Sequence, residues 1–258
     1  MNTNEIVIVT SFNEAIFQHS GNAMLLSVMK HLDLNKIRFI IFYEGSFSIQ
    51  IHSDFIENFE FVNASRYKFL MNWLQENIDV IPKCYGGLHS NRMPYFQKNS
   101  SKFFRKVAAL KYAYDKYSDA KKIIWMDADM VILKDIDHNF FSTVFNDRYA
   151  CYYLYGKYRR GLNKHLHVEL QKGVESCLLV FNKPFSILSE WIDAYKDKQF
   201  RRYRRWDDGW VLAEILEHSI HSSYDFGGPA DNPLRATKLC GWFRHHKGRH
   251  QEKGIHLY

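Results

Sequence analysis

Short apolar runs and longer amphipathic segments alternate along the first half of the chain. Apolar runs bounded by polar or glycine-containing turns are typical of buried strands, and apolar residues every three to four positions are typical of helices. The runs that predict strands are Glu5–Thr10, Lys36–Gly45 and Ile123–Met126. The segments that predict helices are Asn22–Leu32, Arg66–Ile78 and Ser101–Tyr117. Prolines and glycines between residues 80 and 100 predict a long loop before the third helix.

The second half of the chain has strand and helix patterns in a less regular order. It predicts a strand at Cys177–Phe181 and helices at Pro184–Tyr195 and Asp207–Glu217. Strands that alternate with helices favour an open, mostly parallel α/β sheet, in which ligands bind beyond the carboxyl ends of the strands. No repeat or linker interrupts the pattern, so we expect a single domain over residues 1–258.

Two carboxylates follow the predicted strand at Ile123–Met126 although apolar residues lie on both sides of them. Asp127 and Asp129 are separated by one residue, and Val131–Leu133 resumes the apolar run. Ionised carboxylates in such surroundings are destabilising unless they are paired or bind a cation. The Asp-x-Asp spacing places both side chains on one side of an extended chain, where they can offer oxygen ligands to a hard divalent cation. A polar turn or helix cap at the end of the strand is the alternative.

The segment Lys106–Asp137 resembles the core of the retaining, metal-dependent nucleotide-sugar glycosyltransferases of the GT-A fold. It is similar to the glycogenin-like family and to the galactosyl-, mannosyl- and xylosyltransferases of the yeast and plant Golgi. The matching residues are Lys106, Ala109, Leu110, Tyr117, Asp119, Ala120, Asp127 and Asp129. The resemblance implies a GT-A type α/β fold, with a Rossmann-like sheet flanked by helices. Residues 1–135 would form the nucleotide-sugar-binding half of the domain, and residues 136–258 the acceptor-binding half.

A later segment, Gly173–Tyr195, resembles the strand and helix that follow the metal site in these families. They usually begin this segment with Gly-Leu-Asn-x-Gly, whereas this chain has Glu175 in place of the Asn and Cys177 in place of the second Gly. The departure concerns the positions expected to contact the acceptor and the donor sugar.

Two further matches lie nearer the end of the chain. Arg205–Leu216 resembles a helix that starts with Asp-Gln in the families, with Asp207 or Asp208 as the aspartate. A His-x-x-Gly pattern begins at His245 and has the spacing of a late third metal ligand, with His246 as the adjacent alternative.

The resemblance gives three groups of residues a role. The residues implied for the cation, Mn²⁺ or Mg²⁺, are Asp127, Asp129 and His245. The residues implied for the nucleotide-sugar donor are Thr10, Ser11, Asn13, Lys106 and Asp127. The residues implied for catalysis on the acceptor side are Asp207, Asp208 and Glu175. Simpler alternatives remain open: a polar loop at residues 10–13, a solvated charge at Lys106, and caps of a helix at the paired aspartates.

The activity implied by the resemblance is metal-dependent transfer of a sugar from a nucleotide-diphosphate sugar, expected to be UDP-linked, to a glycan or another hydroxyl acceptor. Retention of configuration is implied by the resemblance alone. In an inverting enzyme, Asp207 or Asp208 would instead act as a general base. Two other classes remain open: a metal-dependent nucleotidyltransferase or hydrolase with the same Asp-x-Asp, and a noncatalytic protein that binds glycan or nucleic acid.

Charge and cysteine content narrow the partners and the compartment. The chain has 35 basic and 28 acidic residues, a net charge of +7, and a basic, aromatic run at Lys196–Asp208. This run suits contact with an anionic acceptor or with the donor diphosphate, and the alternative is a solvated loop. We expect no nucleic-acid partner. Peripheral contact with a membrane is compatible with the positive charge. The four cysteines are scattered and are expected to be small core residues. With no leader or membrane-spanning pattern, a cytoplasmic location is expected.

Overall fold

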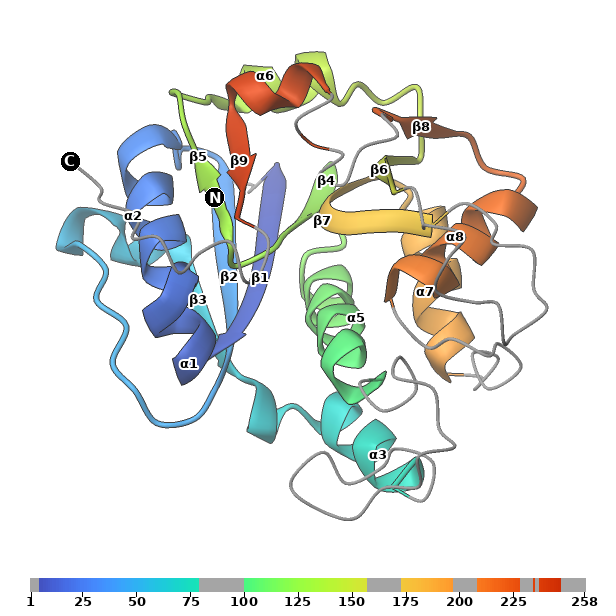
Figure 1. The fold of residues 1–258 in the computed structure, drawn as a ribbon, viewed down its shortest axis with the longest axis horizontal. Helices are drawn as coiled ribbons and strands as arrows, with labels where there is room; N and C mark the ends of the chain where they lie inside the picture. Colours follow the sequence, from blue (N-terminus) through green and yellow to red (C-terminus); the bar gives the residue numbers. More distant parts are fainter. Residues whose placement is uncertain are drawn as a thin grey trace.

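A seven-stranded sheet lies at the centre of the molecule and has helices on both faces (Figure 1). The computed structural model describes residues 5–78, 100–156, 173–196, 208–227, 234 and 237–246. Within them the strand order is β3-β2-β1-β4-β7-β6-β8. The pairs among β3, β2, β1 and β4 are parallel, as is β6 with β8, whereas β7 is antiparallel to β4 and β6. The predicted mostly parallel α/β sheet is therefore confirmed.

The elements that the sequence predicts appear in the predicted order, together with others that it does not predict. The strands are β1 (Ile6–Asn13), β2 (Ile37–Glu44), β3 (Phe59–Asn63), β4 (Lys122–Met126), β5 (Met130–Ile132), β6 (Cys151–Gly156), β7 (Gly173–Asn182), β8 (Ser223–Asp225) and β9 (Phe243–His245). The α-helices are α1 (Glu14–Ile16), α2 (Asn22–His31), α3 (Lys68–Glu76), α5 (Ser100–Lys116), α6 (His138–Val144), α7 (Ser186–Lys196) and α8 (Asp208–His218). The other helical turns are η1 (Phe17–Gly21), η2 (Ser53–Asn58), η3 (Ala64–Arg66) and η7 (Lys238–Gly241).

The first strand is longer than its apolar run predicts. β1 was expected to end at Thr10, but its parallel ladder with β2 continues as far as the pair Asn13 and Glu44. The expectation of a loop at residues 10–13 is therefore wrong, because backbone pairing with β2 holds these polar residues extended. The loop predicted between residues 80 and 100 falls almost entirely on residues 79–99, which lie outside the described residues.

Two apolar layers form the core, one on each face of the sheet. Val7 and Val9 of β1 pack into the layer that contains the buried residues of α5 and α7. Ile6 and Ile8 alternate with them and pack into the layer that contains the buried residues of α2. Burying one such aliphatic side chain contributes about 1.5–3 kcal/mol. Because β1 and β4 are covered on both faces, their carboxyl ends are held rigidly side by side.

A second, two-stranded sheet brings a late segment of the chain to the end of β4. After β4 the chain turns back, with the Met130 N–H donating to the Asp127 carbonyl at 3.0 Å, and enters β5. β9 pairs antiparallel with β5, and Met130 is the partner of His245 in this register. The two strands lie next to each other at one side of the central sheet (Figure 1).

The described cysteines differ in their surroundings. Cys151 and Cys177 are buried, as expected of core residues, but Cys240 is exposed in η7, so the expectation is wrong for that residue. Cys84 lies outside the described residues. Among the helices that the structure describes, none combines the length and the apolar composition that a membrane span requires.

Candidate active site

Asp127, Asp129 and His245 come together where β4 ends. Asp127 directly follows β4, and the tight turn into β5 places Asp129 two residues later. His245 Nε2 lies 3.1 Å from Asp129 Oδ1, and the imidazole is 6% exposed. A ligand atom from each of the three side chains lies within 4.8 Å of the other two. The second histidine considered from sequence, His246, donates its backbone N–H to the Asp129 carbonyl at 2.9 Å.

The electrostatics of this group favour a cation. Burial raises the pKa of Asp127, and although Lys106 acts against this rise, the charge of Asp129 adds to it. Burial also lowers the pKa of His245, but its hydrogen bond to Asp129 and the negative charges nearby outweigh burial, so the pKa is raised overall. The two carboxylates therefore repel each other, and positive charge between them would relieve that repulsion.

The ammonium of Lys106 lies between two carboxylates. Lys106 Nζ is 2.5 Å from Asp208 Oδ2 and 3.2 Å from Asp127 Oδ1. It also donates to the carbonyl of Ser176 at 2.9 Å and to its hydroxyl at 2.7 Å. The residue is 8% exposed, which contradicts the alternative of a solvated charge. Burial lowers the pKa of Lys106, but the charges of Asp127 and Asp208 outweigh it, so the ammonium stays protonated.

Asp208 begins α8 but does more than cap it. Its Oδ1 accepts the Gly209 N–H at 2.9 Å, and its Oδ2 accepts the Ser176 hydroxyl at 2.6 Å in addition to pairing with Lys106. The carboxylate is buried, unlike an ordinary cap at a solvated helix end. The neighbouring candidate, Asp207, lies outside the described residues.

Two residues of this network were not predicted from the sequence. Ser176 joins Lys106 to Asp208, and Trp125 donates its indole N–H to Asp127 Oδ1 at 2.5 Å. Trp125 also places its ring 5.0 Å from Lys106 Nζ. Trp125 was predicted only as an apolar residue of a strand. Ser176 belongs to no motif, although its neighbours Glu175 and Cys177 both depart from the family pattern.

The residues expected to hold the donor's base and ribose lie along the end of β1. Thr10 is fully buried, and its Oγ1 has no hydrogen-bond partner among the described residues. Ser11 is half-buried, and Asn13 is exposed and caps α1 by accepting the Ile16 N–H at 2.9 Å. Since Val9 pairs with Trp125 on β4, Thr10 lies one position further toward the carboxyl end at which Asp127 is found. Their contact with a donor stays a prediction.

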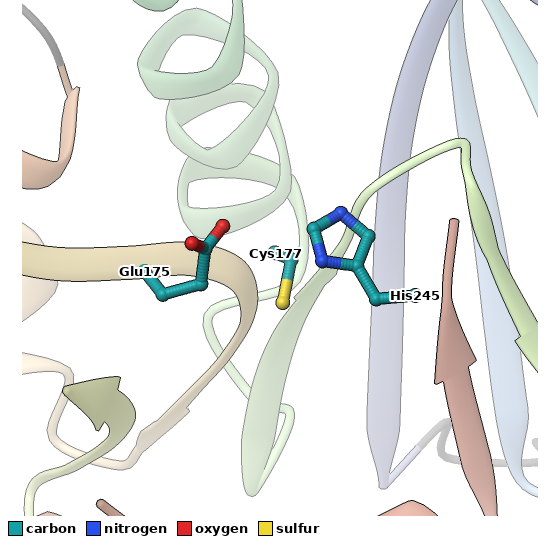
Figure 2. A group of neighbouring side chains, drawn as sticks. All are labelled: Glu175, Cys177 and His245. Carbon is teal, nitrogen blue, oxygen red and sulfur yellow. The ribbon is translucent and has the colours of Figure 1, made fainter. Parts of the chain in front are cut away.

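Glu175 and Cys177 approach the same place from β7. The Cys177 carbonyl accepts the Asp127 N–H at 2.9 Å, so the middle of β7 lies directly beside the carboxylate pair. A carboxylate oxygen of Glu175, the Cys177 Sγ and a ring nitrogen of His245 lie within 4.8 Å of one another. Figure 2 shows these three side chains converging from two different strands. Burial raises the pKa of the Cys177 thiol well above its ordinary value, and the charge of Glu175 adds to this rise.

Comparison with known proteins identifies the fold. No family model matches the sequence, and no curated protein matches it. Among solved structures, the galactosyltransferase LgtC in complex with donor and acceptor sugar analogues is similar at a TM-score of 0.51 and 12% identity, over 94% of this chain and 87% of that chain. Mouse xyloside xylosyltransferase 1 gives a TM-score of 0.49 at 13% identity, over 85% of this chain and 84% of that one. The chain therefore has the GT-A type fold of glycosyltransferases.

Proposed function

We propose that this protein is a glycosyltransferase that moves a sugar from a nucleotide-diphosphate sugar to a hydroxyl group of a glycan or another acceptor. The observation that carries the proposal is the meeting of Asp127, Asp129 and His245 at the carboxyl end of β4, in a GT-A type fold. A UDP-linked donor and retention of configuration are the expected details, and they rest on the resemblance of the sequence. LgtC, whose structure holds donor and acceptor sugar analogues, supports the same class of partners.

The three side chains fit a divalent cation. Two carboxylates and one imidazole supply oxygen and nitrogen ligands, a set that suits Mn²⁺, and the unbalanced negative charge around Asp127 favours its binding. When bound, such a cation would neutralise negative charge that develops on the departing diphosphate. Asp127, Asp129 and His245 would hold it, and the antiparallel pair of β5 and β9 keeps the imidazole beside the turn.

Lys106 acts in this proposal as a positioning residue. Its ammonium has three hydrogens, and four protein acceptors already surround it. It therefore holds Asp127 toward the cation and Asp208 toward the acceptor side, and contributes to donor binding mainly through them. Asp208 Oδ2 pairs with Lys106 at 2.5 Å and accepts the Ser176 hydroxyl at 2.6 Å, so the carboxylate is held in a fixed orientation and suits the role of orienting a sugar hydroxyl.

Glu175 is the further candidate for contact with the acceptor or the donor sugar. It is half-buried on β7, in the strand that also carries Ser176 and Cys177. The basic run that suggested an anionic acceptor lies mainly in residues 197–207, outside the described residues.

A screen of nucleotide sugars tests the proposal. The purified protein is incubated with individual donors, with Mn²⁺ or with excess EDTA, and release of nucleoside diphosphate is measured with and without glycan acceptors. We expect turnover of one class of donor, its loss on chelation, and its return with Mn²⁺. Asp129→Asn is the matched variant and should be inactive with every donor. Full activity in EDTA would contradict the proposal. Release of a nucleoside monophosphate and a sugar 1-phosphate, in which the bond between the two phosphates breaks, would also contradict it and favour the nucleotidyltransferase or hydrolase alternative.

A further inference from the structure

Glu175, Cys177 and His245 form a second group of ligating atoms beside the aspartate pair. Their oxygen, sulfur and nitrogen atoms lie within 4.8 Å of one another, and Figure 2 shows Cys177 between Glu175 and His245. Cys177 is fully buried and forms no disulfide. A buried thiol that faces a carboxylate and an imidazole is more than a small core residue.

The chemistry of this group differs from that of the aspartate pair. A thiolate sulfur prefers Zn²⁺ and similar borderline or soft cations, whereas carboxylate pairs suit Mg²⁺ and Mn²⁺. One cysteine, one histidine and one carboxylate are ordinary zinc ligands, and three protein ligands leave a fourth position open for water. As the bond between Cys177 Sγ and the cation forms, the S–H bond breaks and the thiol proton passes to solvent; a proton on the His245 nitrogen that binds the cation leaves in the same way.

His245 belongs to both groups. Its Nε2 already lies 3.1 Å from Asp129 Oδ1, and a ring nitrogen also lies within reach of Cys177 and Glu175. In a neutral imidazole one nitrogen carries the hydrogen, so a single lone pair is available to a cation. His245 can therefore serve one of the two groups at a time.

We propose that Glu175, Cys177 and His245 form a second cation site that takes Zn²⁺, and that its occupation removes His245 from the Asp127 and Asp129 site. Zn²⁺ would then antagonise the cation that supports turnover by withdrawing one of its ligands. The binding of Zn²⁺ is independent of the proposed sugar transfer, whereas the antagonism depends on the cation site described above.

Cobalt spectroscopy of the full-length protein tests the site directly. The protein is stripped with a chelator, dialysed and titrated with Co²⁺, which replaces Zn²⁺ and gives a sulfur-to-cobalt charge-transfer band when a thiolate binds it. We expect the band to saturate at one equivalent and to disappear when Zn²⁺ is added. Cys177→Ala and Cys177→Ser should both lack the band; the serine variant keeps the size of the side chain and guards against loss of folding in the alanine variant.

Two variants separate this site from its surroundings. Cys240→Ser removes the exposed cysteine and should retain the band. Asp129→Asn should also retain it, because Asp129 belongs to the other group of ligands. A wild-type protein without the band, or a band that persists in both Cys177 variants, overturns the proposal. Equal loss of the band in Asp129→Asn would also overturn it, because all five side chains would then bind a single cation.

A competition experiment tests the antagonism. Bound Mn²⁺ is followed by electron paramagnetic resonance, in which only the free ion gives its sharp signal. Adding one equivalent of Zn²⁺ should release Mn²⁺ from the wild type and leave it bound in Cys177→Ser. Release in both proteins, or in neither, contradicts a shared His245. Neither measurement uses a sugar donor. If the protein binds both cations but turns over no donor, the proposed sugar transfer is wrong and the second cation site still stands.

Discussion

At the residue scale, the ammonium of Lys106 links the two halves of the candidate site. It pairs with Asp127 at the end of β4 and with Asp208 at the start of α8; Lys106 and Asp208 are buried, and Asp127 is half-buried. Removing one member of such a group leaves buried charge without compensation, which costs far more than an exposed ion pair is worth. The stability of the site therefore depends on all three residues together.

Lys106→Met should lower the free energy of unfolding by about 3–5 kcal/mol, because the buried Asp208 and the half-buried Asp127 lose their counter-charge. Urea unfolding measures this loss. The double variant Lys106→Met with Asp208→Asn should recover part of it, since one uncompensated charge is removed. Lys111→Met on the same helix is the control: Lys111 pairs with Asp115 at i,i+4, and such a pair contributes about 0.3–0.5 kcal/mol. Equal effects of Lys106→Met and Lys111→Met would show that the buried pairing is unimportant.

Asp208→Asn should lower sugar transfer by roughly tenfold or more while binding of the nucleotide donor stays unchanged, because misplacing the acceptor hydroxyl costs rate in the chemical step. Unlike the loss of a solvated cap, this change should also lower the melting temperature, because Lys106 keeps only Asp127 as a charged partner. Steady-state kinetics, isothermal titration with the nucleotide and thermal unfolding measure the three quantities. Glu217→Gln at the exposed end of α8 is the control. Transfer at the wild-type rate would remove Asp208 from the acceptor side.

At the element scale, the edge strand β3 is tied to α5 through one carboxylate. Glu60 on β3 accepts hydrogen bonds from Tyr112, Lys116 and Tyr117, which lie on or just after α5. Burial raises the pKa of Glu60, but the hydrogen bonds from Lys116 and the two tyrosines outweigh it, so the pKa lies below its ordinary value. The ionised carboxylate is thus favoured in the folded protein.

Glu60→Gln should therefore destabilise the protein in a pH-dependent way. A lowered pKa in the folded state contributes stability that is fully present above the ordinary pKa of 4.5 and is lost as the pH falls through the folded value. We expect the variant to be less stable by about 1–3 kcal/mol at pH 7. The difference from the wild type should shrink below pH 4.5, the ordinary value for the group. Chemical unfolding at pH 7 and pH 4 measures this, with Glu57→Gln on the exposed turn η2 as the control. A difference that does not change with pH would contradict the role of the charge.

Some of the strands and helices could be predicted from the sequence, and others could not. Long apolar or amphipathic segments such as β2 and α5 could be predicted, because their pattern follows from burial on one or both faces. The end of β1 could not, since polar residues there are held by the ladder with β2. β5 and β9 have three residues each and were missed as a pair, because strands this short carry no periodic signal. The proximity of Cys177 and His245 depends on the pairing of β5 with β9, so it could not be predicted from the sequence either.

At the scale of the whole molecule, cation binding should be linked to global stability. A ligand that binds the folded protein alone stabilises it by about 2.7 kcal/mol at a hundred times its dissociation constant. Mn²⁺ should therefore raise the melting temperature of the wild type, and excess EDTA should reverse the rise. Asp129→Asn should show no such shift in melting temperature. It should melt close to the metal-free wild type, because relief of the repulsion between Asp127 and Asp129 offsets the stability lost with the contact between Asp129 and His245. Equal shifts in both proteins would place the cation elsewhere.

The pairing of β9 with β5 also has a consequence for synthesis on the ribosome. The carboxylates on either side of Ala128 emerge early, and the parallel strands β1, β2 and β4 can associate once they are made. The imidazole that completes the cation site arrives only with Phe243–His245. A nascent chain that has not reached His245 can thus hold most of its sheet without a complete site. A chain stopped at Trp242 should fold around its central sheet and bind Mn²⁺ poorly, so binding of the metal marks a chain that has been translated past His245.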